Sequence, residues 1–508
     1  MSGWYTDARL LYGRSGEAGD DGVSEKIPTL REAIRAIADA RDLTLNELAG
    51  KLGYKSGTSL MRLMDDPVRD KTLETFEQRV QTELTLSEEE LRLVSDGILV
   101  KREGPQAWLV RQEVAAFVRG DQREDPGRIE IRGPDGRRYA GLTDYLAGRK
   151  ELRLTVFNCM DDRVAGELER LLRHTDAVIR NDISLDDRQR RTIYCYRTIA
   201  PLMFHRHYEP YVLPEGSPAS APGMTGLSRS DAIVCESVDE EGQTRRELFI
   251  LVDGAAQALP LPAMEGMDRP KSLVPLKQTW YDCESFADYI GYSQSYYDLE
   301  KDHAWWKLKP DIGVDSISGD ILARAVREGP IPWEKEYDEV LEVLRVMYNE
   351  RFANAFGRGK HHFTVMKQSA MKRFVETGRT TDHFWAMRAY TGQERLQILR
   401  VLVDKARTDP FVHLLFLKDE GLVRDMEMCY YEDRGLLLLR ADTDYDLRAD
   451  HGQILLRDPA VLESYRSYYM DQIVKRGCLD ERESLAVLEK LLATAEAICR
   501  KEAHKRTG

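Results

Sequence analysis

The sequence is poor in cysteine and arranges none of it in a metal-binding or redox pattern. The seven cysteines are scattered along 508 residues without a C-x-x-C pair, which favours reduced, mostly buried thiols over a zinc site or a disulfide framework. No stretch approaches the roughly eighteen consecutive apolar residues that a membrane-spanning helix needs, and residues 1–21 mix charges with glycines instead of forming an apolar signal core. These absences predict a cytoplasmic protein without a bound metal or membrane contact.

The motifs that mark nucleotide cofactors and serine hydrolases are also missing. Neither a G-x-G-x-x-G fingerprint nor a G-x(4)-G-K-[ST] loop occurs, so we expect no cofactor, and no G-x-S-x-G elbow is present. The formal net charge of -13 argues against a protein that binds nucleic acid over its whole surface, because phosphate contacts need a local positive excess. Any DNA contact must therefore be confined to one small part of the chain.

The length is sufficient for two to four domains, and the patterns predict a multi-domain α+β protein. An all-α bundle is expected at residues 27–97, followed by a linker with a connecting helix at 98–135. A large mixed α/β region then divides into a first half at 136–275, a helical and aromatic connecting region at 276–390, and a second half with C-terminal helices at 391–508. The two α/β halves are expected to be similar and to carry helical insertions.

Residues 27–97 show the periodicity and the capping signals of short helices. Thr29 can cap a helix whose apolar residues recur every three or four positions. Thr44 and Glu47 form a capping box that starts a second helix. These signals predict two short helices before residue 53.

Gly53 is expected to end the second helix, because a C-terminal cap favours a residue that tolerates positive φ, and Ser56 can cap a third helix. Two more helices are expected, one after a turn at 70–72 and one at 86–94, the latter with Ser87 as its cap. In the third helix Leu60 and Leu63 face inward. The outward face then carries the expected DNA-binding residues Lys55, Ser56, Thr58, Ser59 and Arg62.

The segment LTLNELAGKLGYKSGTSLMRL, residues 43–63, resembles the second and third helices of the Cro/repressor-type helix-turn-helix family. The resemblance covers residues 30–94 and implies a bundle of about five helices that binds double-stranded DNA. The sequence departs from the expected charge at Asp65, Asp66 and Asp70, which follow the third helix. Because these acids weaken phosphate binding, productive binding would need a homodimer or a higher oligomer. The alternative is a small protein-interaction bundle that does not contact DNA.

The remainder alternates strands and helices in the manner of a mixed α/β sheet. Residues 152–159 form an expected strand, followed by a helix and by a second strand over AVIRNDI, which together make a β-α-β unit. A hairpin is expected around the turn at 133–136. Later in the chain, strands over 426–431 and 435–439 are expected to pair, and helices at 459–475 and 480–502 follow. In each half, a strand and a helix thus lead to later hairpin-like strands.

The closing segment HGQILLRDPAVLESYRSYYMDQI resembles the end of a phospholipase D-type half-domain, a family built from two such halves. Catalysis in that family requires H-x-K-x(4)-D in each half, with a histidine nucleophile and a lysine that holds phosphate. Here His451 has no lysine two positions on, and His205-Arg206-His207 lacks the lysine and aspartate partners. The resemblance therefore implies degenerate halves that bind rather than cleave, without catalytic residues.

A concentration of basic and aromatic residues in GRTTDHFWAMR suggests a ligand site. Its candidate residues are Arg379, His383, Trp385 and Arg388, in which the two arginines could clamp a phosphate or carboxylate. The alternative is a polar hinge between the two halves. The cluster DHAWWKLKPD, residues 302–311, could likewise be an anionic-ligand pocket or a pair of buried tryptophans that lock domains together.

Two histidine pairs have weaker signals. His205 and His207 would share a face if they lay in a strand, but no third metal ligand is visible, so a structural or surface role is favoured. His361 and His362 are interpreted as part of a solvated basic patch. The pattern as a whole favours a DNA-binding transcriptional regulator whose large region senses a small anionic ligand or holds a homodimer. The alternative is a phosphodiesterase or nuclease-like enzyme that its helix-turn-helix domain localises.

Overall fold

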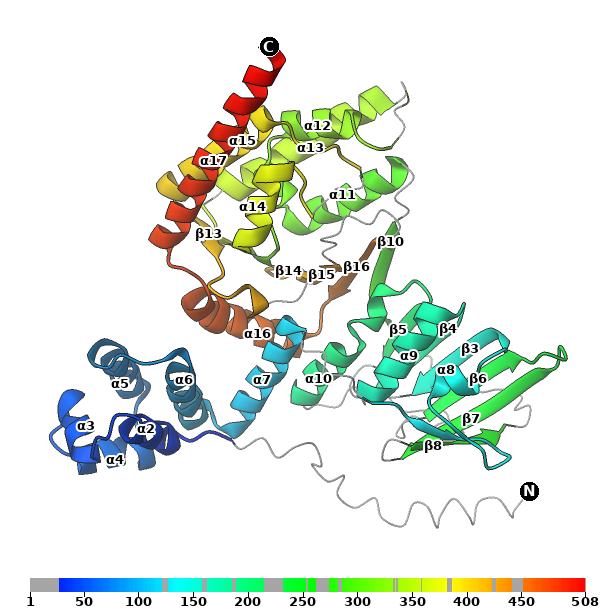
Figure 1. Cartoon of the computed structure of the whole chain (residues 1–508), viewed down its shortest axis with the longest axis horizontal. Helices are drawn as coiled ribbons and strands as arrows, with labels where there is room; N and C mark the ends of the chain where they lie inside the picture. Colours follow the sequence, from blue (N-terminus) through cyan, green and yellow to red (C-terminus); the bar gives the residue numbers. More distant parts are fainter. Residues whose placement is uncertain are drawn as a thin grey trace. The chain divides into compact units, whose positions relative to one another are not determined.

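A computed structural model describes most of the chain, which divides after Leu109 into two compact units (Figure 1). The described residues are 27–120, 127–157, 162–184, 189–213, 232–252, 255–261, 274–281, 286–331, 334, 337–357, 359–381, 386–422, 426–440 and 451–507. Each unit has a hydrophobic core of its own. Of the seven cysteines, Cys159 and Cys283 lie outside the described residues. The five described cysteines are free thiols, and four of them are buried.

The described part of the N-terminal unit is helical, as expected. Its helices are α2 (Leu30–Asp39), α3 (Leu45–Lys51), α4 (Gly57–Asp65), α5 (Asp70–Glu83) and α6 (Glu88–Glu103). Capping boxes begin α2 at Thr29, α3 at Thr44 and α6 at Ser87. Each box satisfies backbone N–H groups that the helix itself leaves without partners, so these starts follow from local sequence.

Two boundaries in this unit differ from the prediction. The helix α5 begins at Asp70, so residues 70–72 are its first turn and not a turn before it. The helix α6 runs on to Glu103 and so crosses the boundary predicted at residue 97. Gly97 does not break the helix: a Cβ there would lie 2.7 Å from the Leu30 Cα atom, so the glycine allows α6 to approach α2 closely.

The predicted inward faces of these helices are confirmed. Leu48 and Leu52 pack with Leu60 and Leu63 in one core, and each is less than 5% exposed. The same core holds Phe76 of α5. Burying these side chains supplies the main stabilisation of a bundle whose individual helices are too short to persist alone in water.

The first sheet of the second unit contains nine strands among the described residues, in the order β2-β1-β8-β7-β6-β3-β4-β5-β9. These strands are β1 (Glu130–Arg132), β2 (Arg138–Tyr139), β3 (Lys150–Phe157), β4 (Val178–Ser184), β5 (Tyr208–Leu213), β6 (Ala232–Val238), β7 (Thr244–Val252), β8 (Ala255–Pro260) and β9 (Val274–Pro275). The accompanying helices are α7 (Pro105–Arg119), α8 (Leu142–Tyr145), α9 (Asp162–His174) and α10 (Gln189–Ile199). The predicted β-α-β unit is confirmed as β3-α9-β4, with parallel strands, and the predicted hairpin as β1-β2.

The second sheet contains seven strands among the described residues, in the order β10-β16-β15-β14-β11-β12-β13. They are β10 (Lys277–Tyr281), β11 (Trp305–Leu308), β12 (His362–Met366), β13 (Val412–Phe416), β14 (Met426–Tyr431), β15 (Gly435–Arg440) and β16 (His451–Leu456). Its helices are α11 (Phe286–Glu300), α12 (Gly319–Arg327), α13 (Tyr337–Gly357), α14 (Gln368–Thr377), α15 (Gly392–Thr408), α16 (Pro459–Tyr468) and α17 (Glu481–Thr507), with a π-helix at Tyr469–Gly477. In Figure 1, α11 to α15 and α17 lie on one side of this sheet and α16 on the other.

Both sheets follow the same order of strands. In the first, β3, β4 and β5 are parallel, and β6, β7 and β8 extend the sheet antiparallel on the other side of β3. In the second, β11, β12 and β13 are parallel, and β14, β15 and β16 extend it antiparallel beyond β11. The chain passes from one sheet to the other through β9, which pairs with β5, and β10, which pairs with β16.

The segment 276–390, expected to be a helical and aromatic connecting region, contributes three strands to the second sheet. These strands, β10, β11 and β12, have at most five residues each. Both faces of the second sheet are covered: on β15, Leu436 and Leu438 belong to one core, and Leu437 and Leu439 belong to the other. Strands buried on both faces lack the alternation of apolar and polar residues that marks a strand in a sequence, so short ones are easily missed.

Candidate functional site

The turn between α3 and α4 is built by one glycine conformation and two local hydrogen bonds. Gly53 adopts a φ of 72°, in the left-handed region where glycine carries no steric penalty. The Ser56 side chain accepts a hydrogen bond from the Ser59 N–H at 3.3 Å and so begins α4. The Asn46 Oδ1 atom accepts one from the Gly57 N–H at 2.7 Å. The two helices are thus joined by a short turn that caps and side-chain contacts hold.

Three of the five expected DNA-binding residues are exposed at the start of α4 or along it. These residues are Lys55, Thr58 and Arg62. Within the part of the chain that the structure describes, their side chains form no hydrogen bond or ion pair. The other two, Ser56 and Ser59, are partly buried, and their hydroxyl groups lie 3.3 Å apart. Ser56 therefore serves the helix cap, and the outward polar face is narrower than expected.

The acidic charge that follows α4 is partly compensated. Arg31 of α2 forms a two-point ion pair with Asp65, and these hydrogen bonds hold the pKa of the Asp65 carboxyl below its ordinary value. Lys101 of α6 donates a hydrogen bond to the Met64 carbonyl at 2.8 Å, where the C-terminal end of α4 favours a positive charge. Asp66 and Asp70 are exposed. The expected repulsion of phosphate is thus reduced at Asp65.

The candidate ligand segment is a loop that leads from α14 to α15. Its base is closed by the Tyr390 N–H, which donates to the Gly378 carbonyl at 2.7 Å. Arg379, near this base, is exposed. His383 and Trp385 lie outside the described residues.

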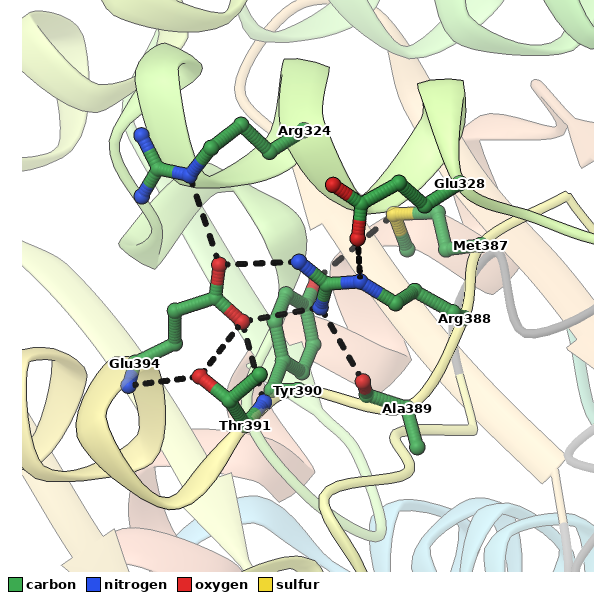
Figure 2. A network of polar contacts seen from close by, with 8 residues as sticks. All are labelled: Arg324, Glu328, Met387, Arg388, Ala389, Tyr390, Thr391 and Glu394. Carbon is green, nitrogen blue, oxygen red and sulfur yellow. Dashed lines mark hydrogen bonds and ion pairs between the residues drawn. The ribbon is translucent and has the colours of Figure 1, made fainter. Parts of the chain in front are cut away.

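Arg388, the fourth expected ligand residue, is held by two carboxylates (Figure 2). It donates to Glu328 at the end of α12 at 2.6 Å, and to both carboxylate oxygens of Glu394 on α15 at 2.8 and 3.1 Å. These hydrogen bonds, those donated to Glu394 above all, raise the pKa of Arg388. Burial alone would raise the pKa of Glu394, but its contacts with Arg388 and with the Thr391 N–H lower it. Arg388 therefore links α12, the loop and α15, and a ligand would have to displace a carboxylate to reach it.

Thr381 attaches the same loop to the end of β11. Its N–H and its hydroxyl contact the two Asp311 carboxylate oxygens at 2.9 and 2.8 Å. Asp311 lies three residues beyond the end of β11. Ligands of open α/β sheets bind outside the carboxyl ends of parallel strands. The described part of the loop therefore lies at the edge of the sheet where such a ligand would be expected.

The residues of DHAWWKLKPD do not form an exposed ligand pocket. Trp305 is 1% exposed, and Lys307 and Lys309 are 1% and 2% exposed. They lie on β11 or just after it, and they are buried because both faces of the second sheet are covered. Of the alternative, a pair of buried tryptophans that lock domains together, the burial is seen for Trp305, while Trp306 is only partly buried.

Lys307 belongs to a buried ionic network that the sequence did not reveal. Its Nζ atom lies 2.6 Å from Glu300 and 3.2 Å from Asp315, and Arg351 binds the same Glu300 carboxylate at 2.6 and 3.2 Å. Burial lowers the pKa of Lys307, but the two carboxylates reverse this, and the net shift is upward. Beside the network, burial and the charge of Lys307 lower the pKa of His362 to about 4. His362 is therefore a buried neutral histidine and not part of a solvated patch.

Lys309 neutralises a second buried pair of carboxylates. Its Nζ atom lies 3.0 Å from Glu427 of β14. Burial and the nearby Glu427 raise the pKa of Asp311 to about 7. Glu427 and Asp311 both lie within hydrogen-bond distance of the Thr381 hydroxyl, at 3.2 and 2.8 Å. That hydroxyl has one hydrogen to donate, so a proton carried by one of the two carboxyl groups and donated to the Thr381 oxygen satisfies the second contact.

Of the other histidines singled out in the sequence, the structure describes the side chains of His205 and His207. His205 and His207 lie in the turn before β5 and not in a strand, so they do not share a sheet face. The His451 side chain lies outside the described part. Among the described residues, no group of three or more His, Cys, Asp or Glu side chains is arranged to hold a metal ion. No helix in those residues is long and apolar enough to cross a lipid bilayer.

Comparison with known proteins adds no family assignment. No protein-family model matches the chain, and no curated protein sequence matches it significantly.

Proposed function

We propose that the chain is a DNA-binding transcriptional regulator that contacts double-stranded DNA through α3 and α4. The observation that carries the proposal is the exposure of Lys55, Thr58 and Arg62 on a helix held by a short turn against its neighbour. Cationic and hydroxyl side chains near the start of such a helix can reach base edges in the major groove and adjacent phosphates. The resemblance of residues 43–63 to Cro/repressor-type proteins supports the same function.

The charge distribution favours binding as a homodimer. The net charge of the chain is -13, and Asp66 and Asp70 remain exposed beside α4. A single copy of α4 therefore offers few phosphate contacts, and two linked copies would bind more tightly than either alone. The two α/β halves would supply the dimer contact or the response to a ligand.

The second unit is proposed to be a duplicated phospholipase D-like region that binds rather than cleaves. Support comes from the matching strand order of the two sheets. Its proposed ligand is a small anion at the carboxyl edge of the second sheet, near Arg379. The sequence also offers His383 and Trp385 as ligand residues, and these lie outside the described residues. Arg388 would act there indirectly, because it holds the loop through Glu328 and Glu394.

A selection from a pool of genomic DNA fragments tests the DNA-binding proposal. The full-length protein should enrich one sequence, and its affinity should fall steeply with salt. The K55Q and R62Q variants should each weaken binding if their side chains bind phosphate. Each should also reduce the slope of the logarithm of affinity against the logarithm of salt concentration by about 1. The K372Q variant, which removes an exposed charge from α14, is the matched control. Recovery of no enriched sequence, with a folded N-terminal unit, would contradict the proposal.

A further inference from the structure

Two histidines far apart in the sequence meet at the edge of the second sheet. His361 directly precedes β12, and His413 lies in β13, the last strand at that edge. The His361 Nδ1 atom lies 2.9 Å from the His413 Nε2 atom. The ring planes differ by 15° and the centroids are 5.2 Å apart, so the rings meet edge to edge. The two nitrogens therefore point at one another.

A carboxylate fixes the protonation of the inner histidine. The Glu481 Oε1 atom, at the start of α17, lies 2.6 Å from the His413 Nδ1 atom. An ionised carboxylate only accepts hydrogen bonds, so the Nδ1 atom donates to Glu481, and in the neutral ring the Nε2 atom keeps its lone pair. Metal-binding histidines are commonly oriented in this way, with one ring nitrogen donating to a carboxylate and the other binding the ion.

The surrounding rings hold His413 and leave His361 accessible. Phe363 stacks on His413 with a centroid distance of 4.2 Å and an interplanar angle of 11°. The His413 side chain is 13% exposed. His361 is exposed and contacts the edge of Phe411. The His413 Nε2 atom is thus held in place. The exposed His361 ring can rotate and turn its Nδ1 atom towards an ion that both histidines bind.

We propose that His361 and His413 bind one Zn²⁺ ion through the Nδ1 and Nε2 atoms, with Glu481 as a positioning residue. Zinc–nitrogen bonds of about 2.0–2.1 Å would place the two nitrogens roughly 3.3 Å apart in a tetrahedral site. This is slightly more than the present 2.9 Å, and the rings would turn so that both lone pairs point at the ion. Without the ion, the same two nitrogens are joined by a hydrogen bond. Because no third protein ligand is arranged there among the described residues, water completes the site, and the ion exchanges. This inference does not depend on DNA binding.

Titration calorimetry of the full-length protein with Zn²⁺ tests the inference. One site is expected in the wild type and should be lost in H361F and in H413F, which keep an aromatic ring in place. The E481Q variant should weaken binding about 10–100-fold, because outer carboxylates tune the affinity of the ligand they orient. The H174N variant, which removes an exposed histidine from α9, should bind as the wild type does.

Copper provides a readout of the ligand atoms. With one equivalent of Cu²⁺, the electron paramagnetic resonance spectrum of the wild type should show coupling to two nitrogens, reduced in either histidine variant. Equal Zn²⁺ binding by the wild type, H361F and H413F would overturn the proposal. An E481Q variant that folds and binds Zn²⁺ with unchanged affinity would overturn the role of Glu481.

Discussion

The Asn46 side chain joins the starts of two helices, because its Oδ1 atom accepts a hydrogen bond from the Gly57 N–H at 2.7 Å. Gly57 is the first residue of α4, and Asn46 lies in the first turn of α3. The contact leaves no room for a side chain: a Cβ at Gly57 would lie 2.8 Å from the Asn46 Oδ1 atom and 3.2 Å from the Leu45 carbonyl carbon. The geometry of the proposed DNA-binding helix therefore depends on one glycine.

The G57A variant should destabilise the N-terminal unit by about 1–3 kcal/mol, because the added methyl group forces α3 and α4 apart. Hydrogen exchange of the α3 and α4 amides in the full-length protein measures this loss. The matched control is G50A in α3, where nothing lies within 4 Å of the added Cβ. That variant should gain about 0.5–1 kcal/mol from helix propensity. Equal effects of the two substitutions would show that the close approach is unimportant.

Glu300 should contribute more to stability than any exposed ion pair. Its carboxylate holds Lys307 and Arg351, and all three side chains are 1% exposed. The E300Q variant leaves two buried cations with too little negative charge, so it should cost about 3–5 kcal/mol. Urea unfolding, followed by the fluorescence of tryptophans such as the nearby Trp305, measures the change.

The exposed pair between Arg407 and Glu489 is the control for this prediction. These side chains are 54% and 44% exposed. Solvent screens such a pair, so E489Q should change stability by less than about 1 kcal/mol. If E300Q and E489Q had similar effects, the buried network would have no special weight in the stability of the second unit.

The contrast between these sites explains what the sequence could predict. The starts of α2, α3 and α6 depend on residues three positions apart, such as Thr44 and Glu47, so local patterns identify them. The partners of Lys307 depend on how distant elements pack: Glu300 ends α11, and Arg351 lies in α13. No local pattern distinguishes a lysine that is paired inside a sheet from one that binds a ligand.

The candidate sites divide in the same way. The exposure of Lys55, Thr58 and Arg62 follows from the helical periodicity of one short segment. One of the two carboxylates that contact Arg388, Glu328, lies sixty residues earlier in the chain. The pairing of His361 with His413 spans fifty-two residues. Contacts of this kind require the tertiary structure, and conservation or co-variation would be the sequence signals able to reveal them.

Asp311 should make the stability of the second unit depend on pH near neutrality. Burial and Glu427 raise the pKa of Asp311 to about 7, from an ordinary value near 4. Between these values the folded protein binds a proton that the unfolded chain releases. Stability should therefore fall as pH rises from about 4 to 7, by on the order of 1 kcal/mol per pH unit where the difference is complete.

Urea unfolding at pH 5, 6, 7 and 8 checks this prediction. The D311N variant has no carboxyl group to titrate, so its stability should vary less over this range than that of the wild type. The control is D320N, because Asp320 is exposed on α12. A wild type and a D311N variant with parallel pH profiles would refute the raised pKa of Asp311.

Arg388 should act as a structural anchor whose importance comes from one of its two carboxylates. Glu394 is 8% exposed and Glu328 is 59% exposed, and both contact the Arg388 guanidinium. The R388Q variant leaves the buried Glu394 charge with weaker compensation, so it should cost about 1–3 kcal/mol. The E328Q variant removes only a solvent-screened partner and should cost less than about 1 kcal/mol. Thermal unfolding of both variants tests the difference. If R388Q were as stable as the wild type, Arg388 would not be a structural anchor, and a role in binding an anion would be favoured instead.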